Sequence, residues 1–162
     1  MATSVRPIPQ GYHSITPALT CRDAGRAIEF YKKALGATEL GRMAAPDGRV
    51  MHAELKIGDS IVFLADEFPG ASAAPAPTTT PSSYLYLYVE DADTVFKRAT
   101  SAGCRVDMPV ETMFWGDRYG KVTDPFGHHW GIATHVENVA PEEMKKRSAE
   151  FTAKMAKAAG KS

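Results

Sequence analysis

The sequence predicts an α+β fold made of two βαβββ modules that pair with each other, followed by a C-terminal helix. Three observations predict it: a match between the two halves of the chain, strand-like alternation in each half, and a proline-rich segment between them. The halves match at an offset of 68 residues, and in each an extended apolar segment leads into Asp-Ala and then a helical pattern. The shared order of strand, capped helix and closing glycine indicates an internal duplication. The identical pairs are Leu19 and Leu87, Asp23 and Asp91, Ala24 and Ala92, and Ala65 and Ala133.

The composition is that of a globular protein and argues against several partners. The 162 residues are 44% hydrophobic and 23% charged, as expected for one domain spanning residues 1–162. The 19 basic residues balance the 19 acidic ones, so we expect no nucleic-acid partner. No apolar run approaches the roughly 20 residues of a membrane span, so we expect no membrane partner. With two cysteines and no hydrophobic stretch in the first ten residues, we expect a cytoplasmic protein.

A helix is predicted directly after each Asp-Ala pair. In the first half, Asp23 can cap a helix that Gly36 closes, and in the second half a matching pattern ends at Gly103. Apolar residues recur every three or four positions, as one buried helix face requires. They are Ala24, Ala27, Ile28, Tyr31 and Leu35 in the first half, and Ala92, Val95, Phe96 and Ala99 in the second.

Extended segments complete each module. Residues 50–57 and 83–89 alternate between apolar and polar or aromatic side chains, which predicts strands with one face on a core. Residues 60–65 are a short apolar run, and Asp47-Gly48 indicates a hairpin turn. The alternation places Met51, Ala53, Leu55 and Ile57 toward the helix, and His52, Glu54 and Lys56 on the opposite face.

The remaining segments give the domain organisation. The predicted modules cover residues 11–68 and 83–136, and the proline-rich residues 69–82 link them. Pro141, followed by two glutamates, suits the first turn of a further helix over about residues 141–159. The modest apolar stripe of that helix is more typical of a core edge or a subunit interface than of a ligand site.

Three strings of the chain carry a resemblance to a known family: ITPALTCRDAGRAIEFYKKALGA, MHAELKIGDSIVFLADE and WGDRYGKVTDPFGHHWGIATH. They resemble the vicinal oxygen chelate superfamily, which includes glyoxalase I, extradiol dioxygenases and the fosfomycin and bleomycin resistance proteins. Within it they are most similar to the PhnB-like subgroup. The resemblance covers about residues 11–140 and implies the glyoxalase/bleomycin resistance fold, in which two modules form an incomplete, barrel-like sheet around a cavity. It also implies a homodimer.

The same resemblance implies where a metal would bind. Metal-using members hold one divalent ion with four inward-facing side chains, mostly His, Gln and Glu. Phenylalanine and glycine offer no side-chain ligand, and neutral Thr and Tyr hydroxyls are poor ligands for Zn²⁺, Ni²⁺ or Fe²⁺. We therefore expect no metal at the usual site and no cofactor. Carried over by spacing, the four positions fall on Thr16, Phe63, Tyr84 and Gly131.

What remains is an aromatic-walled cavity with a few polar groups, which is typical of a small-molecule pocket. Trp115 either stacks on a planar ligand or packs structurally. Arg118 either grips a carboxylate or phosphate, or pairs with Asp117 to fix its loop. The predicted substrate-binding residues are His52, Glu54, Phe63, Tyr84, Tyr86, Trp115, Arg118 and His129.

These features leave three hypotheses about function, and catalytic residues are not identified. The first is a protein that binds a small aromatic or amphipathic molecule in a metal-free cavity. The second is a metal-dependent lyase, isomerase or dioxygenase with a rebuilt metal site near His52, Glu54 and His129. The third is an interaction protein whose cavity is filled.

Overall fold

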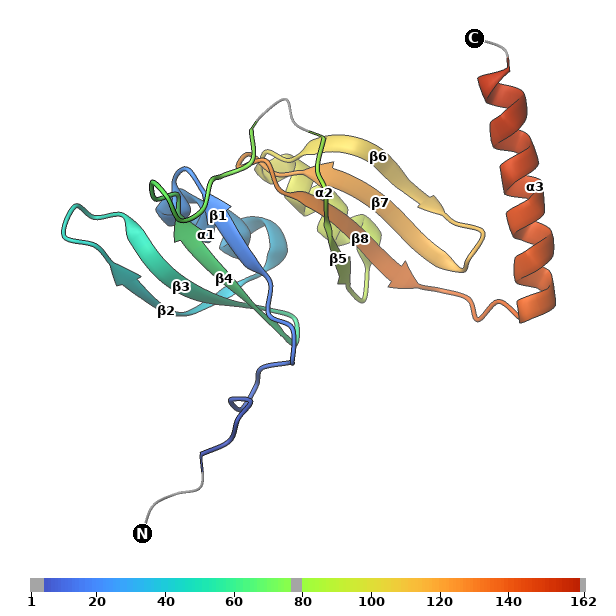
Figure 1. Cartoon of the computed structure of the whole chain (residues 1–162). Helices are drawn as coiled ribbons and strands as arrows, with labels where there is room; N and C mark the ends of the chain where they lie inside the picture. The colour runs from blue at the N-terminus through green and yellow to red at the C-terminus, as the bar shows by residue number, and fades with distance from the viewer. Residues whose placement is uncertain (1–4, 77–79, 161–162) are drawn as a thin grey trace.

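Two four-stranded mixed sheets, each with one helix, make up the body of the protein. A computed structural model describes residues 5–76 and 80–160, so residues 77–79 of the predicted 69–82 linker lie outside the described residues. The first sheet has the order β1-β4-β3-β2 and the second β5-β8-β7-β6, with no closed barrel among the described residues (Figure 1). The α+β fold predicted from the sequence is confirmed. The strands of the first sheet are β1 (Ala18–Cys21), β2 (Thr38–Ala44), β3 (Val50–Ile57) and β4 (Ser60–Asp66), and those of the second are β5 (Leu85–Tyr88), β6 (Arg105–Thr112), β7 (Asp117–Thr123) and β8 (His129–His135).

The strand register repeats the internal match residue for residue. In the parallel pair β1–β4, Ala18 lies opposite Phe63. In the parallel pair β5–β8, Tyr86 lies opposite Gly131. Both members of the second pair follow those of the first by 68 positions, so the duplication extends from the sequence to the hydrogen-bonded ladder.

Helices α1 (Ala24–Leu35) and α2 (Ala92–Ala102) begin in equivalent ways. The Asp23 carboxylate accepts a hydrogen bond from the Arg26 amide, and Asp91 accepts one from the Thr94 amide. The first amide of each helix also donates a hydrogen bond to a side chain in the last strand of its own module. The Ala24 amide donates to Asp66 at 2.8 Å, and the Ala92 amide donates to Thr134 at 2.8 Å. Amides that have no partner within the helix are thus hydrogen-bonded by Asp66 and Thr134, which are 68 residues apart in the sequence.

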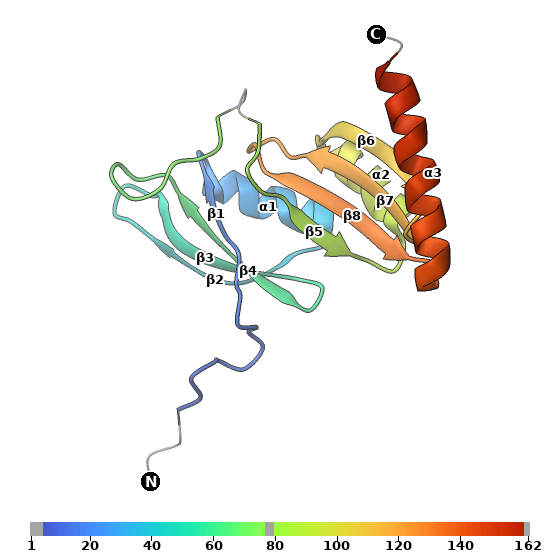
Figure 2. The ribbon, with the colours of Figure 1, turned by 45° about the vertical axis from the view of Figure 1, so that its right-hand side comes forward.

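The two modules share one core on the helix side of the sheets. Helices α1 and α2 pack against each other, and Figure 2 shows α1 behind the space between β1 and β5. Asp124, in the Asp-Pro-Phe-Gly turn between β7 and β8, joins the halves: its carboxylate accepts hydrogen bonds from the Tyr31 hydroxyl at 2.5 Å and from the Trp130 indole N–H at 2.9 Å. All three residues are buried. The modules therefore meet through their helices, and exposed tyrosines lie on the opposite face of the second sheet.

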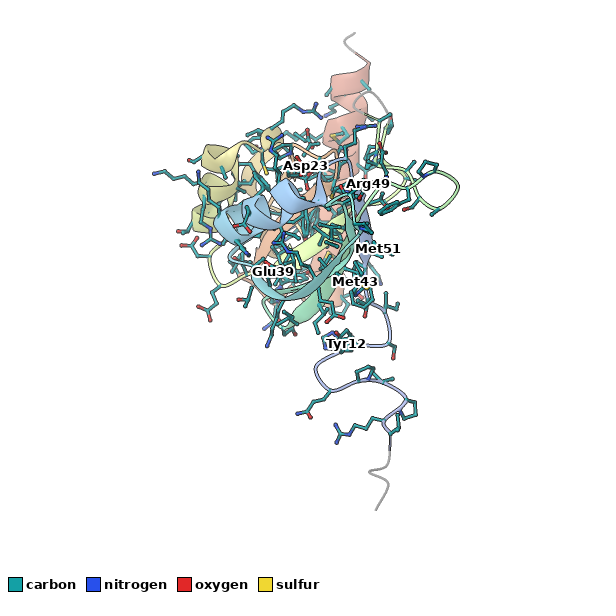
Figure 3. The ribbon with its side chains drawn as sticks, turned by 90° about the vertical axis from the view of Figure 1, so that its left-hand side faces the viewer. Tyr12, Asp23, Glu39, Met43, Arg49 and Met51 are labelled. Atoms are coloured by element: carbon teal, nitrogen blue, oxygen red, sulfur yellow. The ribbon has the colours of Figure 1, made fainter. Side chains whose placement is uncertain are left out.

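The orientation predicted for Met51 is wrong. Ala53, Leu55 and Ile57 are buried on the helix side as expected, but Met51 is 48% exposed and Val50 is buried in its place. The cause is a bulge in β3: Met43 pairs with His52 and Ala44 pairs with Val50, so Met51 is an extra residue, which inverts the alternation on one side of it. Figure 3 shows Met43 and Met51 on the side of the sheet away from α1.

The predicted C-terminal helix is confirmed as α3 (Pro141–Ala159). It stands beside the β6–β7 hairpin, away from the first sheet (Figure 1). Arg147 holds it with paired hydrogen bonds to Glu137, and the Phe151 ring lies 5.0 Å from that of Phe114. None of its residues is buried. Within residues 5–76 and 80–160, no helix has the length and apolarity needed to cross a membrane.

Candidate functional site

An aromatic wall covers the open face of the second sheet; we use this name for Tyr84, Tyr86, Tyr88, Trp115 and Tyr119. Tyr86 and Tyr88 alternate along β5 and Tyr84 directly precedes it, so all three point away from the helices, and their side chains are exposed. The Tyr86 ring stacks on Tyr119 with centroids 5.0 Å apart and planes 7° apart. Trp115 meets Tyr119 edge-on at 5.8 Å. The wall is thus one contiguous set of rings.

The buried carboxylate of Asp117 holds the wall in place. Oδ2 of Asp117 accepts hydrogen bonds from the hydroxyls of Tyr86 and Tyr88 and from the indole N–H of Trp115, at 3.0–3.1 Å. Its Oδ1 lies 2.8 Å from Nδ1 of His135. Burial raises the pKa of Asp117, but the hydrogen bonds from His135 and the three aromatic donors outweigh burial and lower that pKa overall. Asp117 is therefore a carboxylate at neutral pH, and it fixes the positions of three rings.

Glycine at position 131 lets Tyr119 complete the wall. A Cβ atom at Gly131 would lie 2.7 Å from Cε2 and 2.9 Å from the hydroxyl oxygen of Tyr119. The Tyr119 ring therefore occupies the space that any longer side chain at position 131 would need. The hydroxyl of Tyr119 is buried and has no hydrogen-bond partner among the described residues.

The residues at the usual metal positions do not fit a divalent ion. Phe63 and Gly131 have no donor atom, and the Gly131 position is closed by the Tyr119 ring. Thr16 and Tyr84 would supply only two neutral hydroxyls, which are weak ligands for Zn²⁺ or Ni²⁺.

A smaller polar cluster lies on the open face of the first sheet. His52 and Glu54 are neighbours on that face of β3, with Nε2 of His52 3.2 Å from Oε1 of Glu54. Tyr12, in the segment that precedes β1 (Figure 3), donates a 2.5 Å hydrogen bond to Oε2 of Glu54. Hydrogen bonds from Tyr12 and then His52 lower the pKa of Glu54. The Phe63 ring packs edge-on against His52 at 4.7 Å. Three of the predicted site residues thus lie together.

His129 is not part of that cluster. It lies at the start of β8, where Nδ1 is 3.0 Å from the Thr123 hydroxyl and 3.5 Å from the Asp107 carboxylate. Within the described parts of the chain, no three His, Cys, Asp or Glu side chains come together closely enough to hold a metal. The rebuilt metal site of the second hypothesis, near His52, Glu54 and His129, is therefore not assembled among the residues that the structure describes. Instead, His129 and Tyr84 line a groove of about 590 Å³ between β1 and β5.

The Arg118 side chain points to the helix side of the second sheet, away from the aromatic wall. Its guanidinium makes two hydrogen bonds to the carboxylate of Asp93 on α2, at 2.6 and 3.0 Å, and one to Thr112. Because neighbouring strand residues point to opposite faces, Arg118 lies on the helix side while Asp117 lies on the wall side. The alternative in which Arg118 pairs with Asp117 is wrong, and the structure does not bring Arg118 to the wall.

Sequence reasoning missed three residues of this region: Tyr12, Tyr119 and the role of Asp117. The strand parity of β7 carried a signal, because Asp117 and Tyr119 share one face of a strand that pairs with β8. No local pattern marks Tyr12, which reaches Glu54 across 42 residues of sequence.

Comparisons with known proteins place this geometry in a family. The model of the Glyoxalase/Bleomycin resistance protein/Dioxygenase superfamily matches residues 12–132. A relative from Mycobacterium bovis is 41% identical over 149 residues, which cover 90% of this chain and 94% of the relative. The crystal structure of TioX from Micromonospora sp. ML1 is 28% identical with a TM-score of 0.63, covering 76% of this chain and 99% of TioX.

One solved structure bears on the subgroup. A Bacillus cereus protein described as a putative 3-demethylubiquinone-9 3-methyltransferase, PhnB protein, superposes with a TM-score of 0.60 over 75% of this chain and 99% of its own. At 18% identity it shares the fold alone.

Proposed function

Because the chain belongs to the glyoxalase/bleomycin resistance protein/dioxygenase superfamily, we propose that it binds a small aromatic or amphipathic molecule against the aromatic wall without a metal. We assign it to the PhnB-like subgroup and to the cytoplasm, where its two free, buried cysteines stay reduced.

The observation that carries this proposal is the exposure of the wall. Tyr84, Tyr86 and Tyr88 are 50%, 38% and 61% exposed, although aromatic rings of this size usually lie in a core or an interface. Asp117 holds two of these rings and Trp115 rigidly, so a ligand meets a surface whose conformational entropy is already lost. The groove between β1 and β5 adjoins the wall at Tyr84.

A homodimer belongs to this proposal. Both sheets leave one face open, and Met43 and Met51 add exposed apolar area on the first. A second copy would cover these faces and enclose the ligand.

Binding is tested with quinoline, a neutral, planar, two-ring probe. We expect quinoline to quench the fluorescence of Trp115, with a dissociation constant below about 1 mM, equivalent to about 4 kcal/mol. The quenching should be lost in Trp115→Phe, which leaves Trp130 as the single tryptophan. Trp130 is buried against Asp124 and serves as the internal control.

A metal titration covers the alternative enzyme hypothesis. Ni²⁺, Zn²⁺, Mn²⁺ or Fe²⁺ binding at near one equivalent, lost in His52→Ala, would overturn the metal-free proposal and make a metal-dependent lyase, isomerase or dioxygenase the better account. Absence of both quinoline and metal binding would favour an interaction protein instead.

A further inference from the structure

We propose that the aromatic wall selects planar organic cations over neutral or anionic molecules of the same shape. This inference rests on the proposed function and adds the charge class of the ligand.

The first step concerns the hydrogen bonds that the polar groups of the wall already make. The hydroxyls of Tyr86 and Tyr88 and the indole N–H of Trp115 all donate to Asp117. These three groups are therefore not available as donors to a ligand carboxylate or phosphate. What remains for a ligand to contact is the rings themselves, and an aromatic face carries the negative part of the quadrupole.

The second step is a cation that already lies on the wall. Nζ of Lys121 sits 4.9 Å from the centroid of the Tyr84 ring, within the usual range for a cation–π contact. Lys121 lies in β7 and Tyr84 directly precedes β5, so the contact is tertiary. The chain itself thus demonstrates that this ring face accepts a positive charge, and a ligand cation can replace the ammonium group.

The third step is the charge at the polar edges of the rings. The Asp117 side chain is only 3% exposed, and its carboxylate accepts hydrogen bonds from the polar groups of Tyr86, Tyr88 and Trp115. Hydrogen bonding to a carboxylate makes each ring more electron-rich, which strengthens its attraction for a cation. His135, on the other oxygen of Asp117, is the charged partner of this group when protonated.

The fourth step is that, within residues 5–76 and 80–160, Arg118 and Lys121 are already engaged with other groups of the chain. Arg118, which the sequence places next to Asp117, is bound to Asp93 on the opposite face of the sheet. Lys121 is the cationic side chain that contacts the wall, and it is engaged with Tyr84. A bidentate arginine site for a carboxylate or phosphate is thus not formed by Arg118 here.

The test compares three planar two-ring probes by isothermal titration calorimetry on the full chain at pH 8: N-methylquinolinium as the cation, quinoline as the neutral form and 2-naphthoate as the anion. We expect N-methylquinolinium to bind about 5- to 10-fold more tightly than quinoline, as a desolvated cation–π contact provides, and 2-naphthoate to bind most weakly.

Two positions at the wall, the exposed Tyr84 and the half-buried Lys121, allow variants outside the core. Tyr84→Leu should reduce the preference for the cation to near unity, and Tyr84→Phe should lose much less because the ring face is kept. Lys121→Gln should raise the affinity for N-methylquinolinium by about 3-fold, and by more than it changes the affinity for quinoline, because the resident cation is removed. Lys145→Gln makes the same change in net charge on α3, away from the wall, and should leave all three affinities unchanged.

The outcomes separate this inference from the proposed function. Quinoline binding without a preference for N-methylquinolinium overturns the charge selectivity and leaves the binding function standing. Tighter binding of 2-naphthoate also overturns it. If none of the three probes binds, both proposals fail. If Lys145→Gln tightens cation binding as much as Lys121→Gln, the effect is overall charge, and the wall is not its source.

Discussion

The carboxylate of Asp117 combines functions that usually fall to several residues. It accepts hydrogen bonds from three aromatic side chains and pairs with His135, while almost none of it reaches solvent. A buried carboxylate is costly unless its oxygens are hydrogen-bonded, and here donors occupy both. The position of the wall and the ionisation of Asp117 are therefore coupled.

That coupling gives a pH dependence to stability. Hydrogen bonds to Asn138 and Asp117 raise the pKa of His135 above its usual 6.5. A raised pKa in the folded state contributes stability that is fully present below pH 6.5. This contribution is lost as the pH rises through the folded-state pKa. We expect the urea midpoint to fall between pH 5.5 and pH 8.5, and this fall to be smaller in His135→Gln.

The control for this measurement is His13→Gln, at an exposed position outside the network. An equal loss of pH dependence in both variants would mean that the effect is not specific to the Asp117 pair. At the acid end the sign is opposite: the lowered pKa of Asp117 stabilises the fold above about pH 4 and this contribution disappears as the pH falls.

At the scale of elements, both helices, the Asp47-Gly48 hairpin and the C-terminal helix could be predicted because each has a local signal. Gly36, for example, closes α1 with φ of 69°, a left-handed conformation that glycine adopts without strain. Strand parity was predictable for Tyr86 and Tyr88 in β5 but not for Met51, which is an extra residue in β3 that inverts the pattern. Strand parity places Asp117 and Tyr119 on one face of β7, but their partners, like Tyr12 for Glu54, come from distant segments of the chain.

We predict that Asp124 contributes more to the free energy of unfolding than the aspartates that cap the helices. Asp124→Ala would leave the Tyr31 hydroxyl and the Trp130 indole N–H buried without acceptors. Each unsatisfied buried donor costs about 1–3 kcal/mol, so we expect a loss of about 3 kcal/mol in the free energy of unfolding. Asp91→Ala removes an exposed N-cap and should cost about 1 kcal/mol.

Urea denaturation of both variants measures this difference. Equal losses would show that the turn does not join the modules more strongly than an ordinary cap stabilises its helix. Asp23→Ala, the equivalent cap in the first half, provides a second reference for the cost of a cap.

At the scale of the whole molecule, the two halves share the same order of strands and helix but differ in the side chains on their open sheet faces. Their core is continuous through α1, α2 and the aromatic contacts of Tyr31 and Trp130, 5.5 Å apart. The open faces diverge: the first carries His52 and Glu54, and the second carries the aromatic wall. The sequence repeat predicts the order of strands and helix that the two halves share. The difference between their open faces can be interpreted only once the pairing of the strands is known.

A continuous core predicts a single cooperative unfolding transition. We expect circular dichroism and tryptophan fluorescence to give coincident urea curves, because Trp130 lies at the junction of the modules. If the protein is a dimer, the midpoint should also rise with protein concentration. Two separate transitions would contradict the shared core, and a midpoint independent of concentration, together with a monomer mass by light scattering, would contradict the dimer.

The contact between Tyr119 and position 131 also constrains how this protein can change by mutation. A histidine or glutamate at position 131 would collide with a ring that is itself stacked on Tyr86. A variant that gained such a ligand in one step would lose packing before it could gain a metal, and a variant that first lost Tyr119 would give up part of the wall. A metal ligand at position 131 therefore requires a second substitution at position 119, with an unfavourable intermediate in either order. Because Phe63 also lacks a donor atom, a library of single mutants should contain no metal-binding version of this site.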